Sequence, residues 1–161
     1  MDDIAVPVIR QWRPGGCGAA CLGMLLRWYG IAAEDDDLRI RLHESERGTT
    51  MWDLKRVAEA YGLEVFAVRI SRASPSQIVM PAIVHWESNH FLVVEHIGDE
   101  RVRIVEPLFG RARMPRHEFD RGFSGYAMWV ARNAGRSDAC RESNAAATIS
   151  NDLSLSSKPK I

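Results

Sequence analysis

The first part of the chain carries sequence patterns typical of helices, and the rest carries patterns typical of strands. This separation of helices from strands most constrains how the chain can fold. In residues 17–29, apolar side chains recur at the spacing of one helical face. The acidic run Glu34–Asp37 suits the positive N-terminal end of a second helix. Thr50 and Asp53 resemble a capping box, so we predict a third helix over 51–61.

The remainder of the chain carries strand-type sequences instead. Six stretches are rich in β-branched and aromatic residues and are separated by turn residues. They are 63–70, 82–86, 90–96, 102–106, 111–114 and 126–131. Helices followed by an antiparallel meander predict the α+β class, with N-terminal helices packed on an antiparallel β-sheet.

The distribution of aromatic residues separates a folded domain from a tail. All tryptophans, tyrosines and phenylalanines lie before residue 130, and the stretch after Arg132 is rich in Ser and Ala. Such a segment buries too little apolar surface to offset its ordering entropy. We therefore expect one folded domain over 1–132 and a disordered tail over 133–161.

Charge and hydropathy argue against several function classes. Lys plus Arg and Asp plus Glu each number 21, so the net charge is zero, whereas binding to nucleic acid or an anionic membrane calls for a basic excess. No apolar run approaches the roughly 18 residues of a membrane span, and the acidic N-terminus does not resemble a signal peptide. The odd number of cysteines, three, favours reduced thiols and a cytoplasmic setting.

Cys17 is the strongest candidate for chemistry. It lies in the run Pro14-Gly15-Gly16-Cys17-Gly18, where the flanking glycines allow a substrate to approach closely. The predicted helix begins at or beside Cys17, and the helix dipole there favours the thiolate that a cysteine nucleophile needs. The alternative is that Cys17 is only the first apolar residue of an amphipathic helix.

The other two cysteines have weaker cases. Cys21 lies one helical turn after Cys17, on the same face, and is expected to be a small core residue. Two cysteines at this spacing could hold a metal with two further ligands. No Cys/His pair elsewhere has zinc-finger spacing, so we expect neither a metal nor a cofactor. Cys140 lies in the predicted tail and has no expected role.

The spacing of the strands singles out one of the five histidines. A two-residue turn at Gly98-Asp99 would place His90 opposite Pro107. A shift of one residue places His90 beside Glu106, where a carboxylate could orient the imidazole as a base. The other histidines lack such a partner and are expected to be surface or core residues: His43, His85, His96 and His117.

Gln11 is a candidate for stabilising negative charge. It precedes Cys17 by six residues, so its side-chain amide could direct an N–H at an oxyanion that develops beside the thiol. A lone glutamine carries little weight by itself, because most glutamines are solvated.

Short motifs follow one another in a distinctive order along the folded part of the chain. They are Gln11, Cys17-Gly18, Ala20–Met24 and Tyr29-Gly30; then Pro81–Trp86 and Asn89–Val94; then Glu106-Pro107 with Gly110; and finally Glu118–Arg121 with Phe123–Gly125. Over about residues 5–131, this series resembles the papain-like peptidase domain of bacteriocin-exporting ABC transporters. The resemblance is closest to the version found with nitrile-hydratase-type leader peptides.

The resemblance implies a papain-like fold, an activity and the roles of four residues. Members of this family cut leader peptides after a double-glycine motif and are usually fused to a transporter. By resemblance, the nucleophile is Cys17, the base His90, the orienting carboxylate Glu106 and the oxyanion-hole donor Gln11. The chain departs from the family at two positions, because Gly16 and Glu106 both stand where the family commonly has Asp. Glu106 is one methylene longer than that Asp, so we expect it to orient His90 less well.

The resemblance implies a cysteine peptidase that removes double-glycine leaders from ribosomally made, bacteriocin-like precursors. Its expected partner is an ABC transporter, in a separate chain or as the parent protein, and its expected place is the cytoplasm at the inner face of the membrane. One alternative is a non-catalytic docking domain that binds leaders, although the presence of Cys17, His90 and Gln11 favours an enzyme. Another is a papain-like amidase or acyltransferase, which would use the same triad.

Overall fold

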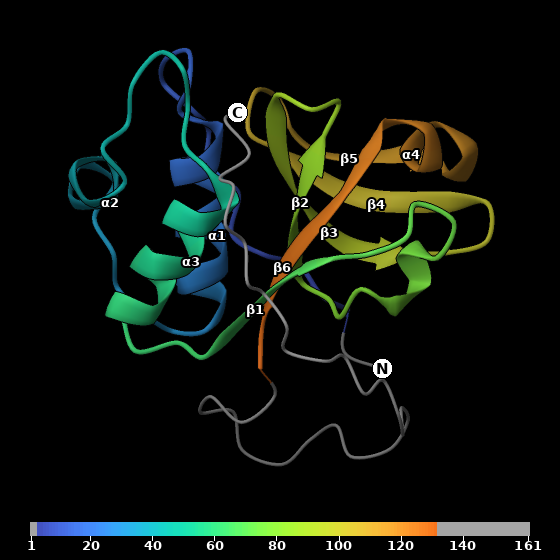
Figure 1. Ribbon diagram of the computed structural model, residues 1–161, viewed down its shortest axis with the longest axis horizontal. Coiled ribbons are helices and arrows are strands. Elements are labelled where there is room, and N and C mark those ends of the chain that lie inside the picture. The colour runs from blue at the N-terminus through green and yellow to red at the C-terminus, as the bar shows by residue number, and fades with distance from the viewer. Residues whose placement is uncertain (1–2, 132–161) are drawn as a thin grey trace.

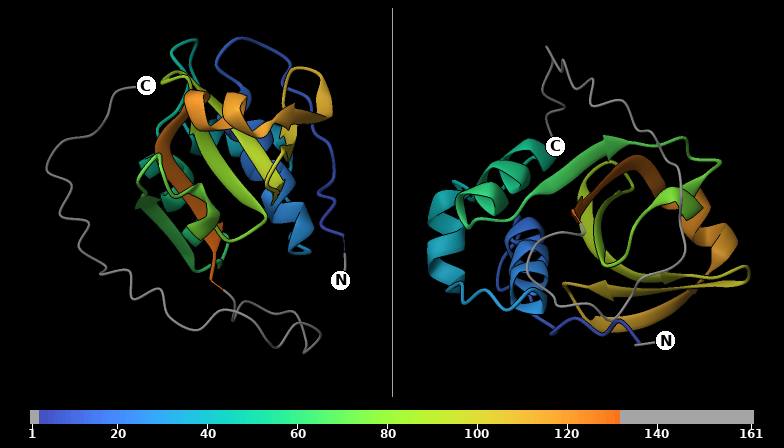
Figure 2. Two further views of the ribbon diagram at one scale, coloured as in Figure 1. Left: turned by 90° about the vertical axis from the view of Figure 1, so that its right-hand side faces the viewer. Right: turned by 90° about the horizontal axis from the view of Figure 1, so that it is seen from below.

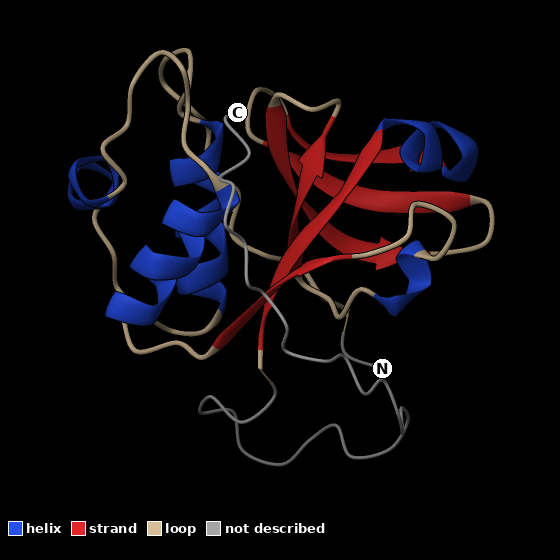
Figure 3. Ribbon diagram, viewed as in Figure 1, coloured by secondary structure: helices blue, strands red, loops and turns tan. Residues whose placement is uncertain are grey.

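A layer of helices lies beside an antiparallel sheet in the computed structural model, which describes residues 3–131 (Figures 1 and 3). The first helices are α1 (Cys17–Trp28), α2 (Asp35–Arg41) and α3 (Met51–Ala60). The strands are β1 (Val65–Arg69), β2 (Ala82–Trp86), β3 (His90–Ile97), β4 (Arg101–Glu106), β5 (Gly110–Pro115) and β6 (Phe123–Val130). The predicted α+β class is confirmed, whereas the predicted tail and Cys140 lie outside the described residues.

The sheet has the strand order β1-β6-β2-β3-β4-β5, and its neighbouring strands are antiparallel. The strands β2 to β5 form the predicted meander. The last strand, β6, lies between β1 and β2 and pairs with both. In a simple meander, β6 would pair with β5 instead. The sheet twists strongly and curves around its inner face (Figure 2).

Two short elements were not predicted from the sequence. Helix α4 (Arg116–Gly122) connects β5 to β6, and a single 3₁₀ turn covers Pro75–Gln77. Elements this short carry too few residues for a periodic pattern, and α4 depends on tertiary packing. Its one buried side chain, Phe119, stacks on Phe123 with ring centroids 5.7 Å apart. None of the helices in residues 3–131 is long and apolar enough to cross a membrane.

Helix α1 is buried on all sides rather than on the one face that its periodicity predicted. The first ten residues, Cys17–Leu26, are all buried. The helix packs on β3 on one side and is covered by α2 and α3 on the other. At Gly18 the neighbouring loop touches the helix backbone, since an added β-carbon would lie 2.2 Å from the methyl group of Thr49. A helix buried all round is held rigidly, which fixes the direction of Cys17 at its start.

Helix α3 begins with the predicted capping box. The Asp53 N–H donates to Thr50 Oγ1 at 3.1 Å, and the Thr50 N–H donates to Asp53 Oδ2 at 3.3 Å. Such a cap is worth about 1 kcal/mol. Because it fixes where α3 starts, it also fixes the end of the loop 44–49 that precedes the helix.

The segment before α1, residues 3–11, lies across the sheet without joining it as a strand, and we call it the N-terminal strap. At its end, the Gln11 N–H donates to the Pro107 carbonyl at 2.9 Å. The Arg10 guanidinium donates to the Phe109 carbonyl, also at 2.9 Å. The strap therefore connects the start of α1 to the turn between β4 and β5.

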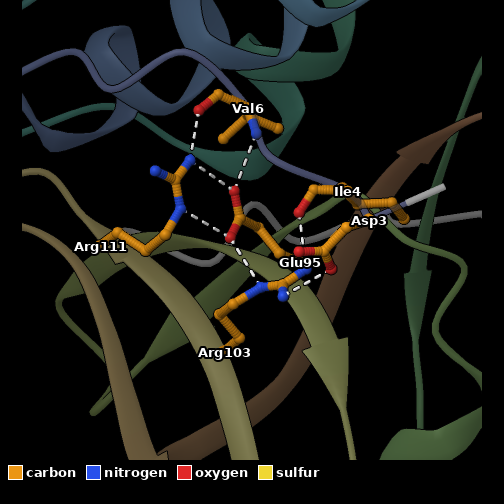
Figure 4. Close-up of polar contacts among 6 residues, drawn as sticks. All are labelled: Asp3, Ile4, Val6, Glu95, Arg103 and Arg111. Carbon is orange, nitrogen blue, oxygen red and sulfur yellow. Dashed lines mark hydrogen bonds and ion pairs between the residues drawn. The ribbon is translucent and has the colours of Figure 1, made fainter.

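A buried carboxylate holds the other end of the strap (Figure 4). The Glu95 side chain is fully buried and accepts the Val6 N–H at 2.8 Å. Arg103 and Arg111 both donate to Glu95 and also donate to the carbonyls of Ile4 and Val6, respectively, at 2.7 Å. The Glu95 carboxylate thus pairs with two guanidinium groups, which satisfies a charge that would otherwise be costly to bury.

Candidate active site

Three of the four candidate residues line one cleft between the helices and the sheet, and the fourth lies beside it. Cys17 is the first residue of α1, His90 is the first residue of β3, and Gln11 ends the strap. The cleft encloses about 120 Å³ and is bounded by residues 46–49 on one side and 89–91 on the other. Glu106, the last residue of β4, contacts His90 from behind.

The imidazole of His90 is held by the carboxylate of Glu106. His90 Nε2 lies 2.7 Å from Oε1 and 2.9 Å from Oε2 of Glu106. The Leu108 N–H donates to Oε1 at 3.0 Å and so fixes the carboxylate. Since Nε2 faces Glu106, the other ring nitrogen, Nδ1, is left for the thiol of Cys17, which lines the same cleft. The row Cys17–His90–Glu106 has the order of a nucleophile, a base and an orienting group.

The predicted contact between His90 and Glu106 is present, but the predicted turn was wrong. Residues 98–100 join the strands, and the Gly98 N–H donates to the Arg101 carbonyl at 2.9 Å. Ile97 therefore pairs with Val102 rather than with Glu100, and the register shifts at a bulge between Val94 and His96. His90 and Glu106 therefore meet as diagonal rather than directly opposite neighbours. Diagonal partners lie about 7–8 Å apart at their backbones, within reach of long side chains. The length of glutamate suits this geometry, and both of its oxygens reach His90.

The surroundings of His90 favour its protonated form. Burial lowers the pKa of His90, but hydrogen bonds to Cys17 and Glu106, together with their negative charges, more than offset burial and raise it to about 9. At neutral pH the ring is therefore an imidazolium beside the Cys17 sulfur. A neighbouring imidazolium stabilises a thiolate, which is the reactive form of cysteine.

Cys21, the second cysteine of α1, lies in the core and not at the cleft. Cys21 is completely buried, and burial, followed by the charges of Cys17 and Glu106, raises its pKa well above the usual value. Cys21 is therefore a neutral core thiol, as predicted. The two cysteines differ because Cys17 faces the cleft and His90, whereas Cys21 faces only the core.

Gln11 reaches the cleft with its side-chain amide. Its Nε2 donates to the Arg13 carbonyl at 3.2 Å, while Oε1 is buried without a hydrogen-bond partner among the described residues. The amide carries two N–H bonds. One donates to the Arg13 carbonyl, and no hydrogen bond of the other is seen among the described residues.

The structure places a carboxylate beside Gly16, the position where the resemblance led us to expect Asp. A β-carbon added at Gly16 would lie 3.6 Å from Oε2 of Glu44. The side chain of Glu44 is only 6% exposed, and its other oxygen pairs with Arg39 Nε at 3.1 Å. The negative charge missing from Gly16 is thus supplied from a different element. Nothing in the sequence pattern around Glu44 predicted this contact.

The cleft walls were also not predicted from the sequence. Gly48 and Thr49 precede the capping box of α3, and Asn89 belongs to the turn before β3. Gly15 lies against this wall so closely that an added β-carbon would approach the Ser45 carbonyl oxygen to 2.1 Å. A positive φ of 80° at Gly15 also favours glycine there. Within residues 3–131, no group of three or more His, Cys, Asp or Glu side chains is placed to hold a metal ion.

Curated relatives match most of this chain. The probable microcin-H47 secretion/processing ATP-binding protein MchF and the colicin V secretion/processing ATP-binding protein CvaB, both from Escherichia coli, are 32% and 31% identical to it over 125 residues. The probable functional amyloid protease FapD from Pseudomonas aeruginosa is 30% identical over 134 residues, which is 59% of its length. The two E. coli matches cover 78% of this chain but only 18% of each relative.

Solved structures show the same fold. A double glycine motif protease from an AMS/PCAT transporter, solved in complex with a leader peptide, superposes with a TM-score of 0.75 at 31% identity, over 78% of this chain and 91% of that one. The peptidase domain of Streptococcus ComA has a TM-score of 0.72 at 22% identity, over 79% and 98% of the two chains. Residues 5–135 match the model of the Peptidase C39 family. The chain therefore belongs to the peptidase C39 family, whose fold is papain-like.

Proposed function

We propose that this chain is a cysteine peptidase that removes leader peptides from ribosomally made, bacteriocin-like precursors after a double-glycine-type motif. The observation that carries the proposal is that Cys17 lines one cleft with His90, whose ring is hydrogen-bonded to Glu106, in a chain of the C39 family. The similarity to a double glycine motif protease solved with a leader peptide supports the substrate class.

The first half of the reaction forms a thioester. The Cys17 sulfur attacks the carbonyl carbon before the scissile bond, and the carbonyl oxygen becomes an oxyanion. The free N–H groups at the start of α1 and the amide of Gln11 stabilise this negative charge. His90 then donates its Nδ1 proton to the leaving nitrogen, the C–N bond breaks, and the segment after the cut departs as an amine.

The second half regenerates the enzyme. Neutral His90 accepts a proton from a water molecule, whose oxygen attacks the thioester carbon. The tetrahedral intermediate collapses, the C–S bond breaks, and the leader departs with a free carboxylate. Glu106 keeps the ring oriented throughout and stabilises its charged form without transferring a proton itself.

The cleft geometry supports a preference for glycine before the cut. Gly15 and residues 46–49 line the cleft together with Cys17, Gly15 lies directly against the Ser45 carbonyl, and the cleft volume is about 120 Å³. Side chains larger than alanine at the two positions before the cut would clash with these walls. Selection then works by excluding wrong substrates more than by attracting the right one.

The proposed partner is an ABC transporter, and the proposed location is the cytoplasmic face of a membrane. This follows the relatives named secretion/processing ATP-binding proteins. The transporter would be either a separate chain or the rest of a longer protein. In either case the peptidase would meet each precursor before export.

Cleavage of a defined peptide tests the proposal. The substrate is a peptide with an amphipathic leader that ends in Gly-Gly, followed by a short cargo segment, and the products are identified by mass. We expect a single cut after the second Gly, no cut by Cys17→Ala, and normal cutting by the matched control Cys21→Ala. Leader binding without cleavage by the unmodified chain would favour a docking domain, and full activity of Cys17→Ala would refute the peptidase assignment.

A further inference from the structure

Several large apolar side chains are exposed next to the catalytic residues. Trp12 is 83% exposed, Phe109 60%, Leu108 58% and Val8 43%. Trp12 directly follows Gln11, and Leu108 lies two residues after Glu106. Exposed apolar groups gathered in one place generally mark a binding surface.

These residues come from two segments that lie side by side. The Gln11 N–H donates to the Pro107 carbonyl at 2.9 Å, and the Arg10 side chain donates to the Phe109 carbonyl. A β-carbon added at Gly110 would lie 3.6 Å from a methyl group of Val8. Residues 8–12 and the β4–β5 turn therefore lie side by side, and we call their exposed apolar side chains, Val8, Trp12, Leu108 and Phe109, the apolar rim.

The apolar rim lies next to the catalytic residues but outside the cleft. The cleft is lined by residues 46–49 and 89–91, and no rim residue contributes to it. Gln11 and His90 line the cleft, and each also connects to the rim: Gln11 through the next residue, Trp12, and His90 through Glu106. A bound peptide that crosses the catalytic residues would thus have one end in the cleft and the other on the rim.

The chemistry of the cut assigns these two ends. His90 gives its Nδ1 proton to the nitrogen of the departing segment, so that segment begins beside the ring of His90, whose other nitrogen is paired with Glu106. The residue that touches this pair from the rim is Leu108, whose N–H donates to Glu106 Oε1 at 3.0 Å. The narrow cleft is the end that suits two small residues before the cut. The part of the substrate after the cut therefore lies on the apolar rim.

We infer that the apolar rim binds apolar side chains in the first few residues after the scissile bond, so the enzyme selects precursors whose mature part begins with apolar residues. This inference rests on the proposed peptidase function and adds a second selection to it, independent of the leader. Burying part of one large apolar side chain on the rim is worth about tenfold in kcat/KM.

A pair of peptides tests the inference. Both carry the same leader ending in Gly-Gly, followed either by Ile-Leu-Phe or by Ser-Asn-Ser, and the readout is the ratio of their kcat/KM values. The unmodified enzyme should prefer the apolar peptide about tenfold. In Trp12→Ser and in Leu108→Ser/Phe109→Ser the ratio should fall towards one. The matched control is Trp52→Ser, which alters an exposed tryptophan on α3 (52% exposed) and should keep the original ratio.

The ratio separates failure of this inference from failure of the proposed function. A variant that is partly unfolded loses rate on both peptides equally, so its ratio is unaffected. If the unmodified enzyme cuts both peptides at equal rates, the peptidase function stands and the rim assignment is refuted. If it cuts neither, the proposed function fails first. If both rim variants keep the tenfold ratio, the inference is overturned. Altered self-association of those variants would then assign the rim to a second copy of the chain, and altered vesicle binding would assign it to a membrane.

Discussion

Two histidines on neighbouring strands, His85 of β2 and His90 of β3, illustrate how local contacts set the chemistry of a residue. His90 sits at the edge of the cleft with a thiol on one side and a carboxylate on the other, and its pKa is raised to about 9. His85 is 4% exposed, neither ring nitrogen has a hydrogen-bond partner among the described residues, and burial and the charge of His90 lower its pKa to about 4. One ring is therefore charged and the other neutral at pH 7.

The raised pKa of His90 predicts an upper pH limit for activity. Proton donation to the leaving nitrogen needs the imidazolium, so kcat/KM should fall as pH rises through about 9. The same proton stabilises the fold below pH 6.5, and that contribution is lost as pH rises through the folded pKa. The measurement is kcat/KM on a Gly-Gly peptide between pH 6 and 11. A rate that still rises at pH 10.5 would mean that a protonated His90 is not required.

The lowered pKa of His85 predicts sensitivity of the fold to acid. The unfolded chain binds a proton on this residue near pH 6.5 and the folded chain only near pH 4, so stability falls as pH drops through this window, by up to about 3 kcal/mol. His85→Phe removes two unpaired buried nitrogens and keeps a ring against Phe91, 5.3 Å away between centroids. We expect it to raise the free energy of unfolding at pH 7 by about 1–3 kcal/mol.

Urea unfolding at several pH values measures this effect. His85→Phe should show a flatter dependence of stability on pH between 6.5 and 4 than the unmodified chain. The control is His96→Phe, which changes an exposed histidine on the same sheet. An unchanged acid dependence in His85→Phe would show that another group is responsible.

At the scale of elements, the N-terminal strap connects the start of α1, where the proposed nucleophile Cys17 lies, to the sheet. Its two ends are held differently, by Glu95 and its arginines at the start and by backbone bonds to the β4–β5 turn at Gln11. The sequence could not predict the strap, because it has no periodic pattern and its partners lie about a hundred residues away along the chain. Long-range pairing of this kind depends on the register of strands, which local sequence does not specify.

Removing the charge of Glu95 should release the strap. Glu95→Gln leaves two guanidinium groups without their shared carboxylate, and disrupting a buried ion pair costs about 3–5 kcal/mol. Urea unfolding measures the loss, with the exposed Arg101→Gln on β4 as the control. A loss below about 1 kcal/mol in Glu95→Gln would mean that the strap is held by its other contacts.

A double-mutant cycle shows whether the strap positions Gln11 for catalysis. If Glu95 acts on activity through Gln11, Glu95→Gln lowers kcat in the unmodified enzyme but has little further effect in Gln11→Ala. Gln11→Ala alone should lower kcat by roughly 10²–10³, the usual loss of one oxyanion donor. If the losses in kcat of the two single variants multiply in the Glu95→Gln/Gln11→Ala double variant, the strap does not act through Gln11 and contributes only to stability.

At the scale of the whole molecule, the proposed active site lies where the helices and the sheet meet. The helical half supplies Cys17, the sheet supplies His90 and Glu106, and the strap supplies Gln11. The three helices and the meander could be predicted because each has its own periodicity or turn residues. The return of β6 into the middle of the sheet could not, because its partners β1 and β2 are specified by packing on both faces rather than by adjacent sequence.

The site residues divide in the same way. Cys17 could be predicted from the local pattern of glycines at a helix start, and His90 from its nearness to a carboxylate across two strands. The loop 44–49, the buried Glu44 and the apolar rim could not, because each becomes part of the site only through contacts between distant segments. For the same reason, the predicted register of β3 and β4 was wrong, although the predicted contact between His90 and Glu106 is present.

Covalent labelling tests the central claim, that Cys17 is the one activated nucleophile, most directly. A peptide chloromethyl ketone ending in Gly-Gly is added at pH 7, and the modified residue is located by mass spectrometry after digestion. We expect one adduct per chain, on Cys17, with much slower labelling in His90→Ala because the thiolate loses its partner. An adduct on Cys21 or Cys140, or equally fast labelling of Cys17 in His90→Ala, would contradict the account.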